Sequence, residues 1–143
     1  MAYSTNIEAA RAFATKAHEG QTDKAGIAYI THPQRVAARL DTPEAKVVGW
    51  LHDAVEDTPL TIHDIEAAFG PETAAAVDAV SRRAGEAWPD YLDRVAAHPI
   101  ARQVKISDLI DNSNLGRLPQ VTLKDVERQK KYNSALRKLL EET

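Results

Sequence analysis

Proline and glycine divide this chain into short segments with a helical pattern of apolar residues, and this division constrains the fold most strongly. Pro43 and Pro71 stand where a first helical turn would begin, whereas Gly20 and Gly70 stand where helices would end. We find no strand-like alternation and no internal repeat. The expected helices span residues 7–18, 33–40, 43–58, 61–69, 71–80, 89–97, 100–111 and 122–141. The sequence therefore predicts an all-α fold, a single compact domain over residues 1–143 with about eight helices.

Composition excludes several classes of protein. A chain of 143 residues can bury a core without disulfide or metal staples, and it contains no cysteine for thiolate chemistry. The net charge of −3 argues against a general nucleic-acid or anionic-membrane binder. No apolar run reaches the length of a membrane span, and the N-terminus lacks a signal-peptide core. We therefore expect a cytoplasmic globular domain with no nucleic-acid and no membrane partner; the sequence leaves its oligomeric state open.

Residues 51–58, Leu-His-Asp-Ala-Val-Glu-Asp-Thr, place one histidine and three carboxylates close together. If the helix over residues 43–58 is continuous, His52 and Asp53 lie one turn before Glu56 and Asp57, and all four share a face. Carboxylates on one face repel one another unless a positive charge lies among them, and a divalent metal would supply it. The alternative is an amphipathic helix with an acidic outer face, which we favour on this segment alone.

A second polar face is predicted in residues 104–112. Lys105, Asp108 and Asn112 share one face of the expected helix, whereas Leu109 and Ile110 belong to its apolar face. The structural interpretation is an amphipathic helix that ends near Asn112. In the functional interpretation, Asp108 is a metal ligand, and Lys105 and Asn112 face the same cleft.

The five histidines differ in how strongly the sequence constrains them. His32 precedes Pro33, so we expect Pro33 at the first helical position and His32 at the cap. His52 is followed directly by an aspartate. His63 and His98 lie among polar residues or before a proline, and we expect both on the surface.

A lone His32, an adjacent His52-Asp53 pair and a distant Asp108 resemble the HD-domain metal-dependent phosphohydrolases. The resemblance narrows to the hydrolase domain of RelA/SpoT-type enzymes, and within that branch to the stand-alone small alarmone hydrolases. The segments that carry it are Ala-His-Glu-Gly-Gln at 17–21, Tyr-Ile-Thr-His-Pro at 29–33, residues 51–58, Phe-Gly at 69–70 and Val-Lys-Ile-Ser-Asp at 104–108. This ordered set favours the functional interpretation of both polar faces and implies an HD-domain helical bundle.

The resemblance implies hydrolysis of the 3′-pyrophosphate of the alarmones ppGpp or pppGpp, giving GDP or GTP and pyrophosphate. It also implies a bound divalent cation, usually Mn²⁺, although a mixed nitrogen and oxygen ligand set accepts Zn²⁺ or Fe²⁺ as well. The implied metal ligands are His32, His52, Asp53 and Asp108. The implied catalytic residues, on the side of the attacking water, are Glu56 and Asp57. The implied substrate-binding residues are Lys24, Lys105 and Asn112.

The sequence departs from this branch around the nucleotide base. The branch has arginine immediately before the loop lysine, where this chain has Asp23, and a threonine where this chain has Leu115. The usual Ala-Asp-Arg-Leu-His-Asn run is Ser-Asp-Leu-Ile-Asp-Asn at residues 107–112. We therefore expect an intact metal centre beside an altered base pocket, with no synthetase domain following. Two further hypotheses are a phosphatase or phosphodiesterase acting on another nucleotide such as NADPH, and a non-catalytic nucleotide-binding regulatory module.

Overall fold

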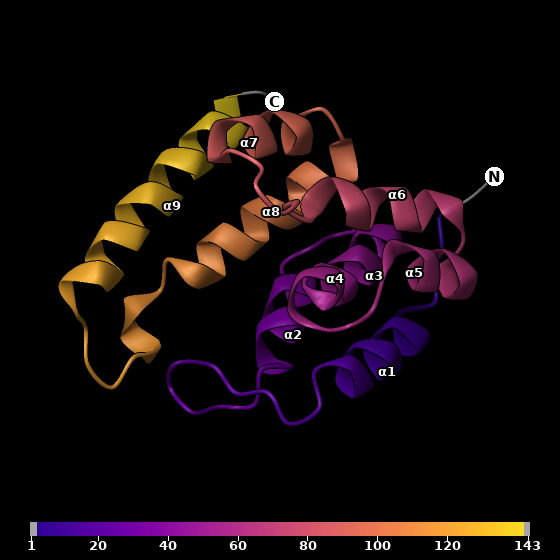
Figure 1. Cartoon of the computed structure of the whole chain (residues 1–143), viewed down its shortest axis with the longest axis horizontal. Coiled ribbons are helices and arrows are strands. Elements are labelled where there is room, and N and C mark those ends of the chain that lie inside the picture. Colours follow the sequence, from indigo (N-terminus) through magenta and orange to yellow (C-terminus); the bar gives the residue numbers. More distant parts are fainter. Residues whose placement is uncertain (1–2, 142–143) are drawn as a thin grey trace.

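The structure is a computed structural model that describes residues 3–141, and this range is built from helices (Figure 1). The elements are α1 (Ile7–Ala17), α2 (Thr31–Ala38), α3 (Pro43–Leu51), α4 (Ala54–Asp57), α5 (Ile62–Phe69), α6 (Pro71–Val80), α7 (Trp88–Ala96), α8 (Pro99–Asn112), the 3₁₀-helix η1 (Leu115–Arg117) and α9 (Leu123–Glu141). Within residues 3–141 the only extended pairing is an isolated bridge between Thr22 and Ala28. The predicted all-α class is confirmed. None of the helices in this range is long and apolar enough to cross a membrane.

Side-chain caps fix where several helices begin. Thr42 precedes the proline that opens α3, and its hydroxyl oxygen accepts a hydrogen bond from the Ala45 amide at 3.2 Å. His98 precedes the proline that opens α8, and its Nδ1 accepts from the Ala101 amide at 3.2 Å. The His98 ring also meets the ring of Tyr3 edge-on, and it is half-buried, in contrast to the surface position expected from the sequence.

The larger of two apolar clusters surrounds α3. Val47, Val48, Trp50 and Leu51 are all buried, so α3 is enclosed on every side by its neighbours rather than presenting one apolar stripe. Gly49 permits the close approach of α2, because a Cβ at this position would lie 3.1 Å from the Cα of residue 37. The central position of α3 therefore places its C-terminal end, residues 52–53, in the interior.

The second apolar cluster joins α7, α8 and α9. Val95, Leu109 and Leu139 are its most deeply buried members. Helix α8 takes part in both clusters and lies between α9 on one side and the α2–α3 pair on the other (Figure 1). One face of α8 is therefore available for polar residues that meet α2 and the end of α3.

Three expectations from the sequence were wrong in detail. The helix over residues 43–58 is interrupted at residues 52–53, because Nδ1 of His52 donates to the Gly49 carbonyl, the acceptor that the next helical amide would use. His32 lies inside α2 rather than at its cap, since α2 begins at Thr31. Ile110 is 44% exposed and Asp111 is buried, so the apolar face of α8 ends at Leu109.

Candidate metal centre

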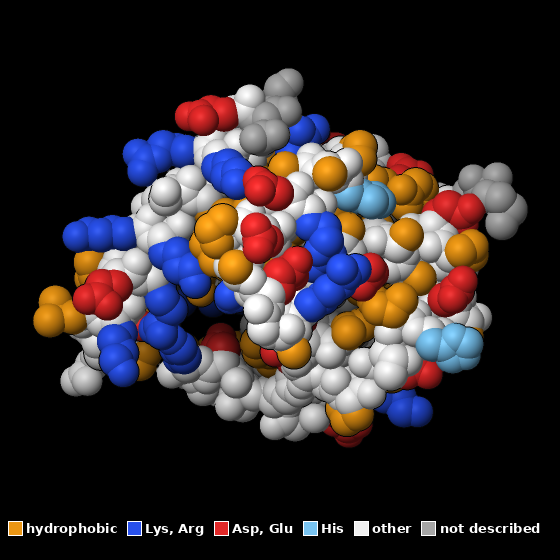
Figure 2. Space-filling model, turned by 45° about the horizontal axis from the view of Figure 1, so that its top comes forward, with side chains coloured by type: hydrophobic (Ala, Val, Ile, Leu, Met, Phe, Trp, Pro, Cys, Tyr) orange, Lys and Arg blue, Asp and Glu red, His pale blue; other side chains and the backbone are white. Residues whose placement is uncertain are grey.

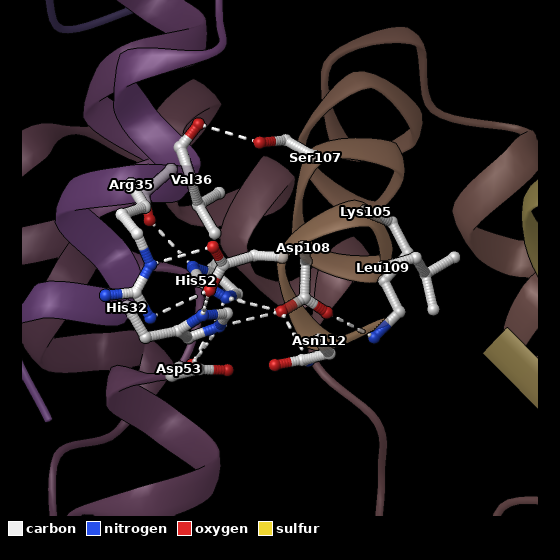
Figure 3. A network of polar contacts seen from close by, with 12 residues as sticks. His32, Arg35, Val36, His52, Asp53, Lys105, Ser107, Asp108, Leu109 and Asn112 are labelled. Atoms are coloured by element: carbon white, nitrogen blue, oxygen red, sulfur yellow. Dashed lines mark hydrogen bonds and ion pairs between the residues drawn. The ribbon is translucent and has the colours of Figure 1, made fainter. Parts of the chain in front are cut away.

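Four buried side chains from separate parts of the sequence meet beside α8 (Figure 3). His32 comes from α2, His52 and Asp53 from the junction of α3 and α4, and Asp108 from the middle of α8. Each offers one ligand atom, and these four atoms lie within 4.8 Å of one another. The residues that the sequence singled out as metal ligands are therefore brought together.

The two imidazole rings direct the same nitrogen toward the two carboxylates. Nε2 of His32 lies 2.8 Å from Oδ1 of Asp108 and 3.4 Å from Oδ2 of Asp53. Nε2 of His52 lies 3.2 Å from each of the same two oxygens. Two nitrogen and two oxygen donors thus face one another, a set that suits Mn²⁺, Fe²⁺ or Zn²⁺.

The other nitrogen of each ring is held from outside the cluster. Nδ1 of His52 donates to the carbonyl of Gly49 at 2.7 Å, and Nδ1 of His32 donates to Oδ2 of Asp111 at 2.7 Å. A hydrogen bond at Nδ1 fixes the tautomer whose Nε2 carries the free lone pair. Both rings are therefore held in the orientation and tautomer that a metal ligand needs.

Asp111 is almost completely buried and binds several cations besides His32. Its carboxylate accepts hydrogen bonds from Arg35 Nε at 2.8 Å and Arg39 Nη1 at 3.2 Å, and Arg117 Nη2 lies 3.4 Å away. Burial alone would raise the pKa of Asp111, but the hydrogen bonds from His32 and Arg35 hold it well below its usual range. Asp111 therefore stays ionised behind His32.

Electrostatics within the cluster favour charged forms in spite of burial. Burial alone would lower the pKa of His52, but the adjacent carboxylates of Asp53 and Asp108 raise it well above its ordinary value. Burial alone would raise the pKa of Asp108, but the Lys105 ammonium and the two imidazoles lower it well below its ordinary value. The carboxylates are thus ionised and require positive charge, which protons on the imidazoles or a cation can supply.

The predicted catalytic acids occupy α4, directly after the cluster. Tyr29 bridges the two groups, since its hydroxyl donates to Oδ2 of Asp53 at 2.7 Å and lies 3.2 Å from Oδ2 of Asp57. Glu56 points elsewhere, and its carboxylate accepts from the backbone amide of Arg82. Burial raises the pKa of both Glu56 and Asp57, and the nearby charge of Asp53 raises it further.

The predicted substrate-binding residues divide into two groups. Lys105 and Asn112 both contact Asp108, because Lys105 Nζ lies 2.8 Å from Oδ2 and Asn112 Nδ2 donates to Oδ1 at 3.1 Å. Lys24 lies farther out, in the loop between α1 and α2, where its ammonium is 3.8 Å from Asp125. The structure therefore places two of the three against Asp108, one of the four clustered donors, and the third nearby.

A pocket of about 340 Å³ adjoins the cluster and connects Lys24 to it. Its lining runs from the loop before α2, across His32 and Asn112, to η1 and the first half of α9. Figure 2 shows a hollow on this side of the molecule with Lys and Arg side chains gathered around it. The basic residues in the lining are Lys24, Arg117 and Arg128. A ligand in this pocket would lie directly beside the four clustered donors.

Comparison with known proteins identifies the family. A family model described as the HD domain matches residues 10–142. The chain belongs to the HD domain family.

Curated relatives of this HD domain are much longer proteins. The bifunctional (p)ppGpp synthase/hydrolase SpoT of Escherichia coli K12 is 46% identical over 74 residues, which cover 48% of this chain and 10% of SpoT. A guanosine-3′,5′-bis(diphosphate) 3′-pyrophosphohydrolase of Aquifex aeolicus is 30% identical over 122 residues, 77% of this chain and 18% of the relative. The matched segment thus spans about a tenth of the length of SpoT.

A solved structure shares the fold. The protein in that structure is a metazoan ortholog of SpoT that hydrolyzes ppGpp and plays a role in starvation responses. It matches this chain with a TM-score of 0.80 at 20% sequence identity. The match covers 98% of this chain and 88% of that protein. The helical architecture described above is therefore a known one for an HD domain.

The donor set of this HD domain fits a divalent cation. Each imidazole has its Nδ1 engaged and its Nε2 directed at the carboxylates, so no rotation of either ring is needed for binding. The carboxylates of Asp53 and Asp108 add two hard oxygen donors. His32, His52, Asp53 and Asp108 could therefore hold one such ion.

Sequence reasoning missed two contributors to the HD domain site. Tyr29 enters the sequence prediction only as a member of the motif at residues 29–33, without a role of its own, but its hydroxyl binds two acidic residues of the site. Asp111 enters it only within the run at residues 107–112 that departs from the branch, although its burial beneath Arg35 makes it a partner of His32. The one available signal was spacing, because Asp111 follows the expected ligand Asp108 by three residues, about one helical turn.

Proposed function

We propose that this HD domain, acting as one catalytic unit over residues 1–143, is a metal-dependent hydrolase of the 3′-diphosphate of ppGpp or pppGpp. The observation that carries the proposal is the convergence of four donor atoms within 4.8 Å beside a pocket whose lining includes Lys24, Arg117 and Arg128. A metal and a phosphate-bearing nucleotide could then meet at one place. The names of the curated relatives support ppGpp as the substrate, and Mn²⁺ and a cytoplasmic location are part of the proposal.

The proposed reaction consumes one water. The water oxygen forms a bond to the phosphorus attached to the 3′-oxygen, and the bond between that phosphorus and the 3′-oxygen breaks. The 3′-oxygen leaves with a proton as the hydroxyl of GDP or GTP, and pyrophosphate is the second product. A bound divalent cation would polarise the phosphoryl group and lower the pKa of water at the site.

Residues of this chain would supply orientation and proton transfer. Asp57 is the better-placed base, because it lies one turn after Asp53 and is linked to it through the Tyr29 hydroxyl. Burial raises its pKa, which brings the carboxylate closer to the range in which a general base is effective. Glu56 would orient water or substrate from the other side of α4, where it is held against the amide of Arg82.

Contacts around the pocket suggest how the nucleotide is held. Asn112 contacts Asp108 and lines the pocket, so its amide could bind a ribose or phosphate oxygen close to the cluster. Lys24 is about 60% exposed and lines the same pocket, so it can bind a phosphate in exchange for its long contact with Asp125. Lys105 would neutralise charge from its place against Asp108.

Product analysis tests the proposal directly. The purified protein with Mn²⁺ and ppGpp should release GDP and pyrophosphate in equal amounts, and orthophosphate should be absent. A panel containing NADPH distinguishes the alternative phosphatase, which would release orthophosphate from NADPH and leave ppGpp intact. Loss of the metal by chelation should stop turnover in either case.

Two variants test the division of roles. Asp53→Ala removes a ligand and should abolish both metal binding and turnover, whereas Glu56→Gln should abolish turnover and keep the metal. Glu66→Gln on α5, an exposed acid that is not one of the clustered donors, is the matched control and should change neither. Equal loss of metal in Asp53→Ala and Glu56→Gln would contradict the assignment.

A further inference from the structure

Three cations surround a single indole ring, and two of them, Arg82 and Lys131, have no role in the proposal above. Lys131 Nζ lies 4.1 Å from the centroid of Trp88, the Arg82 guanidinium carbon 5.5 Å, and Lys105 Nζ 5.6 Å. The ring comes from the start of α7 and the cations from the loop after α6, from α8 and from α9. We call these four residues the Trp88 cluster.

Within residues 3–141, a carboxylate balances only one cation of the Trp88 cluster, Lys105, which pairs with Asp108 at 2.8 Å. Neighbouring cations have acidic partners: Arg94 pairs with Glu86 at 2.8 Å, and Arg83 pairs with Asp78 at 2.9 Å. Among residues 3–141, by contrast, neither Arg82 nor Lys131 has an ion-pair partner. The guanidinium of Arg82 donates instead to the backbone carbonyl of Glu86.

Mutual repulsion within the cluster is evident at Lys131. Burial lowers the pKa of Lys131, and the charges of Arg82 and Lys105 lower it further. Contact with the face of an indole compensates a cation only in part. An anion placed among the three cations would relieve the repulsion that the protein itself leaves in place.

Helix α8 connects the Trp88 cluster to the metal centre. Lys105, Asp108 and Asn112 follow one face of α8 at intervals of three and four residues, and both Lys105 and Asn112 contact Asp108. The face therefore carries the pocket residue Asn112, the proposed metal ligand and the cluster cation Lys105 in a row about 10 Å long. A substrate that extends along this row would have its nucleoside in the pocket and its far end at Trp88.

We propose that the Trp88 cluster binds the terminal phosphate of the 3′-diphosphate, and therefore holds the pyrophosphate product after cleavage. The inference rests on the proposed function and extends it from the reacting phosphorus to the leaving fragment. Arg and Lys donors on three separate elements can surround a phosphate that already contacts the metal centre on its other side. The proposal thus gives a role to Arg82 and Lys131, which have no ion-pair partner within residues 3–141.

Binding of inorganic pyrophosphate to the metal-loaded protein, measured by calorimetry, tests the proposal. Lys131→Met should weaken pyrophosphate binding about tenfold, the loss expected for one charge-assisted hydrogen bond, and Lys131→Arg should restore most of it. Lys130→Met is the matched control, because Lys130 is also exposed on α9 but lies outside the cluster. This control should bind pyrophosphate within twofold of the unmodified protein.

A spectroscopic measurement locates the bound anion. Pyrophosphate should change the fluorescence of Trp88, and the change should disappear in Trp88→Phe, since the other tryptophan, Trp50, is buried in the α3 core. GDP is the comparison ligand, and its affinity should not change in Lys131→Met because it lacks the 3′-diphosphate. Equal pyrophosphate binding in Lys131→Met and Lys130→Met would overturn the proposal, and so would a GDP affinity that falls as far as the pyrophosphate affinity. These measurements need no turnover, so a failure to hydrolyse ppGpp would count against the proposed function alone.

Discussion

Asp111 is the residue through which His32 should be held for metal binding, and Asp111→Asn isolates that role. The substitution keeps the volume of a buried side chain but removes the negative charge and replaces one acceptor oxygen with a donor nitrogen. His32 Nδ1, at 2.7 Å, and the guanidinium groups of Arg35 and Arg39 would then face an uncharged amide. The single amide oxygen cannot replace both carboxylate oxygens, so the hydrogen bond that fixes the tautomer of His32 is weakened or lost to the arginines.

The expected magnitude follows from these contacts. Each charge-assisted hydrogen bond contributes about 1.5–3 kcal/mol, but Arg35 and Arg39 are each about one third exposed and can be solvated instead. Counting mainly the His32 bond and part of the Arg35 pair, we expect the free energy of unfolding to fall by about 3 kcal/mol. The midpoint of thermal unfolding should then fall by about 10 °C. Loss of the acceptor behind a metal-binding histidine should also weaken metal affinity about 10- to 100-fold.

Calorimetric titration with Mn²⁺ and thermal unfolding without metal measure the two effects separately. Asp125→Asn is the control, since Asp125 is a buried aspartate that pairs with Arg128 and makes no contact with a proposed metal ligand. It should lower the unfolding midpoint and leave the Mn²⁺ affinity within about twofold. If Asp111→Asn loses stability but keeps its Mn²⁺ affinity, Asp111 only neutralises arginines, and the reasoning about His32 is refuted.

Three further predictions concern the packing at Gly49, the pH dependence of stability and metal binding, and the role of the Tyr29 hydroxyl in turnover. Gly49→Ala should destabilise the fold by about 1–3 kcal/mol, because the added Cβ would lie 2.9 Å from Leu40 Cδ1 and 3.1 Å from the backbone of α2. Chemical denaturation measures the loss of stability, and an unchanged unfolding midpoint would contradict the prediction. The raised pKa values of His32 and His52 stabilise the metal-free fold below their unfolded pKa near 6.5, and this contribution is lost as the pH rises through the folded values. Protons compete with metal for the same nitrogens, so added Mn²⁺ should raise the unfolding midpoint more at pH 8 than at pH 6. Tyr29→Phe should lower the turnover rate without loss of bound metal, because it removes the hydroxyl that links Asp53 to the proposed base Asp57. If the variant loses its metal, the hydroxyl acts by orienting the proposed ligand Asp53.

Features that depend on a few neighbouring residues, such as the starts of helices, were predictable from sequence. The starts of α3 and α6 agree with prediction because proline at a first helical position is a local signal that neighbouring segments do not override. The convergence of His32, His52-Asp53 and Asp108 was predictable only through the ordered set of motifs, since nothing local indicates that three segments meet. Motif order thus carried the long-range information in the prediction of the site.

Features that depend on side chains from another element were not predictable. The break after Leu51 follows from the bond between His52 and the Gly49 carbonyl, whereas the residue types of 43–58 are compatible with one continuous helix. The position of Asp111 depends on arginines of α2, which lie more than 70 residues earlier in the chain. A periodic pattern cannot distinguish such a buried acid from a solvated one, because both occupy polar positions of the same helix.

The packing of α3 against α2 and the geometry of the proposed metal site depend on the same residue, Gly49. The imidazole rings of His32 and His52 have centroids 5.2 Å apart, and that spacing depends on how closely α2 approaches α3. The approach is limited at Gly49, whose carbonyl also fixes the tautomer of His52. A side chain at this position would therefore separate α2 from α3 and, at the same time, shift the carbonyl oxygen that accepts from His52. On this reasoning, metal affinity should decline in proportion to stability in variants of Gly49, but independently of stability in variants of distant core residues such as Leu139.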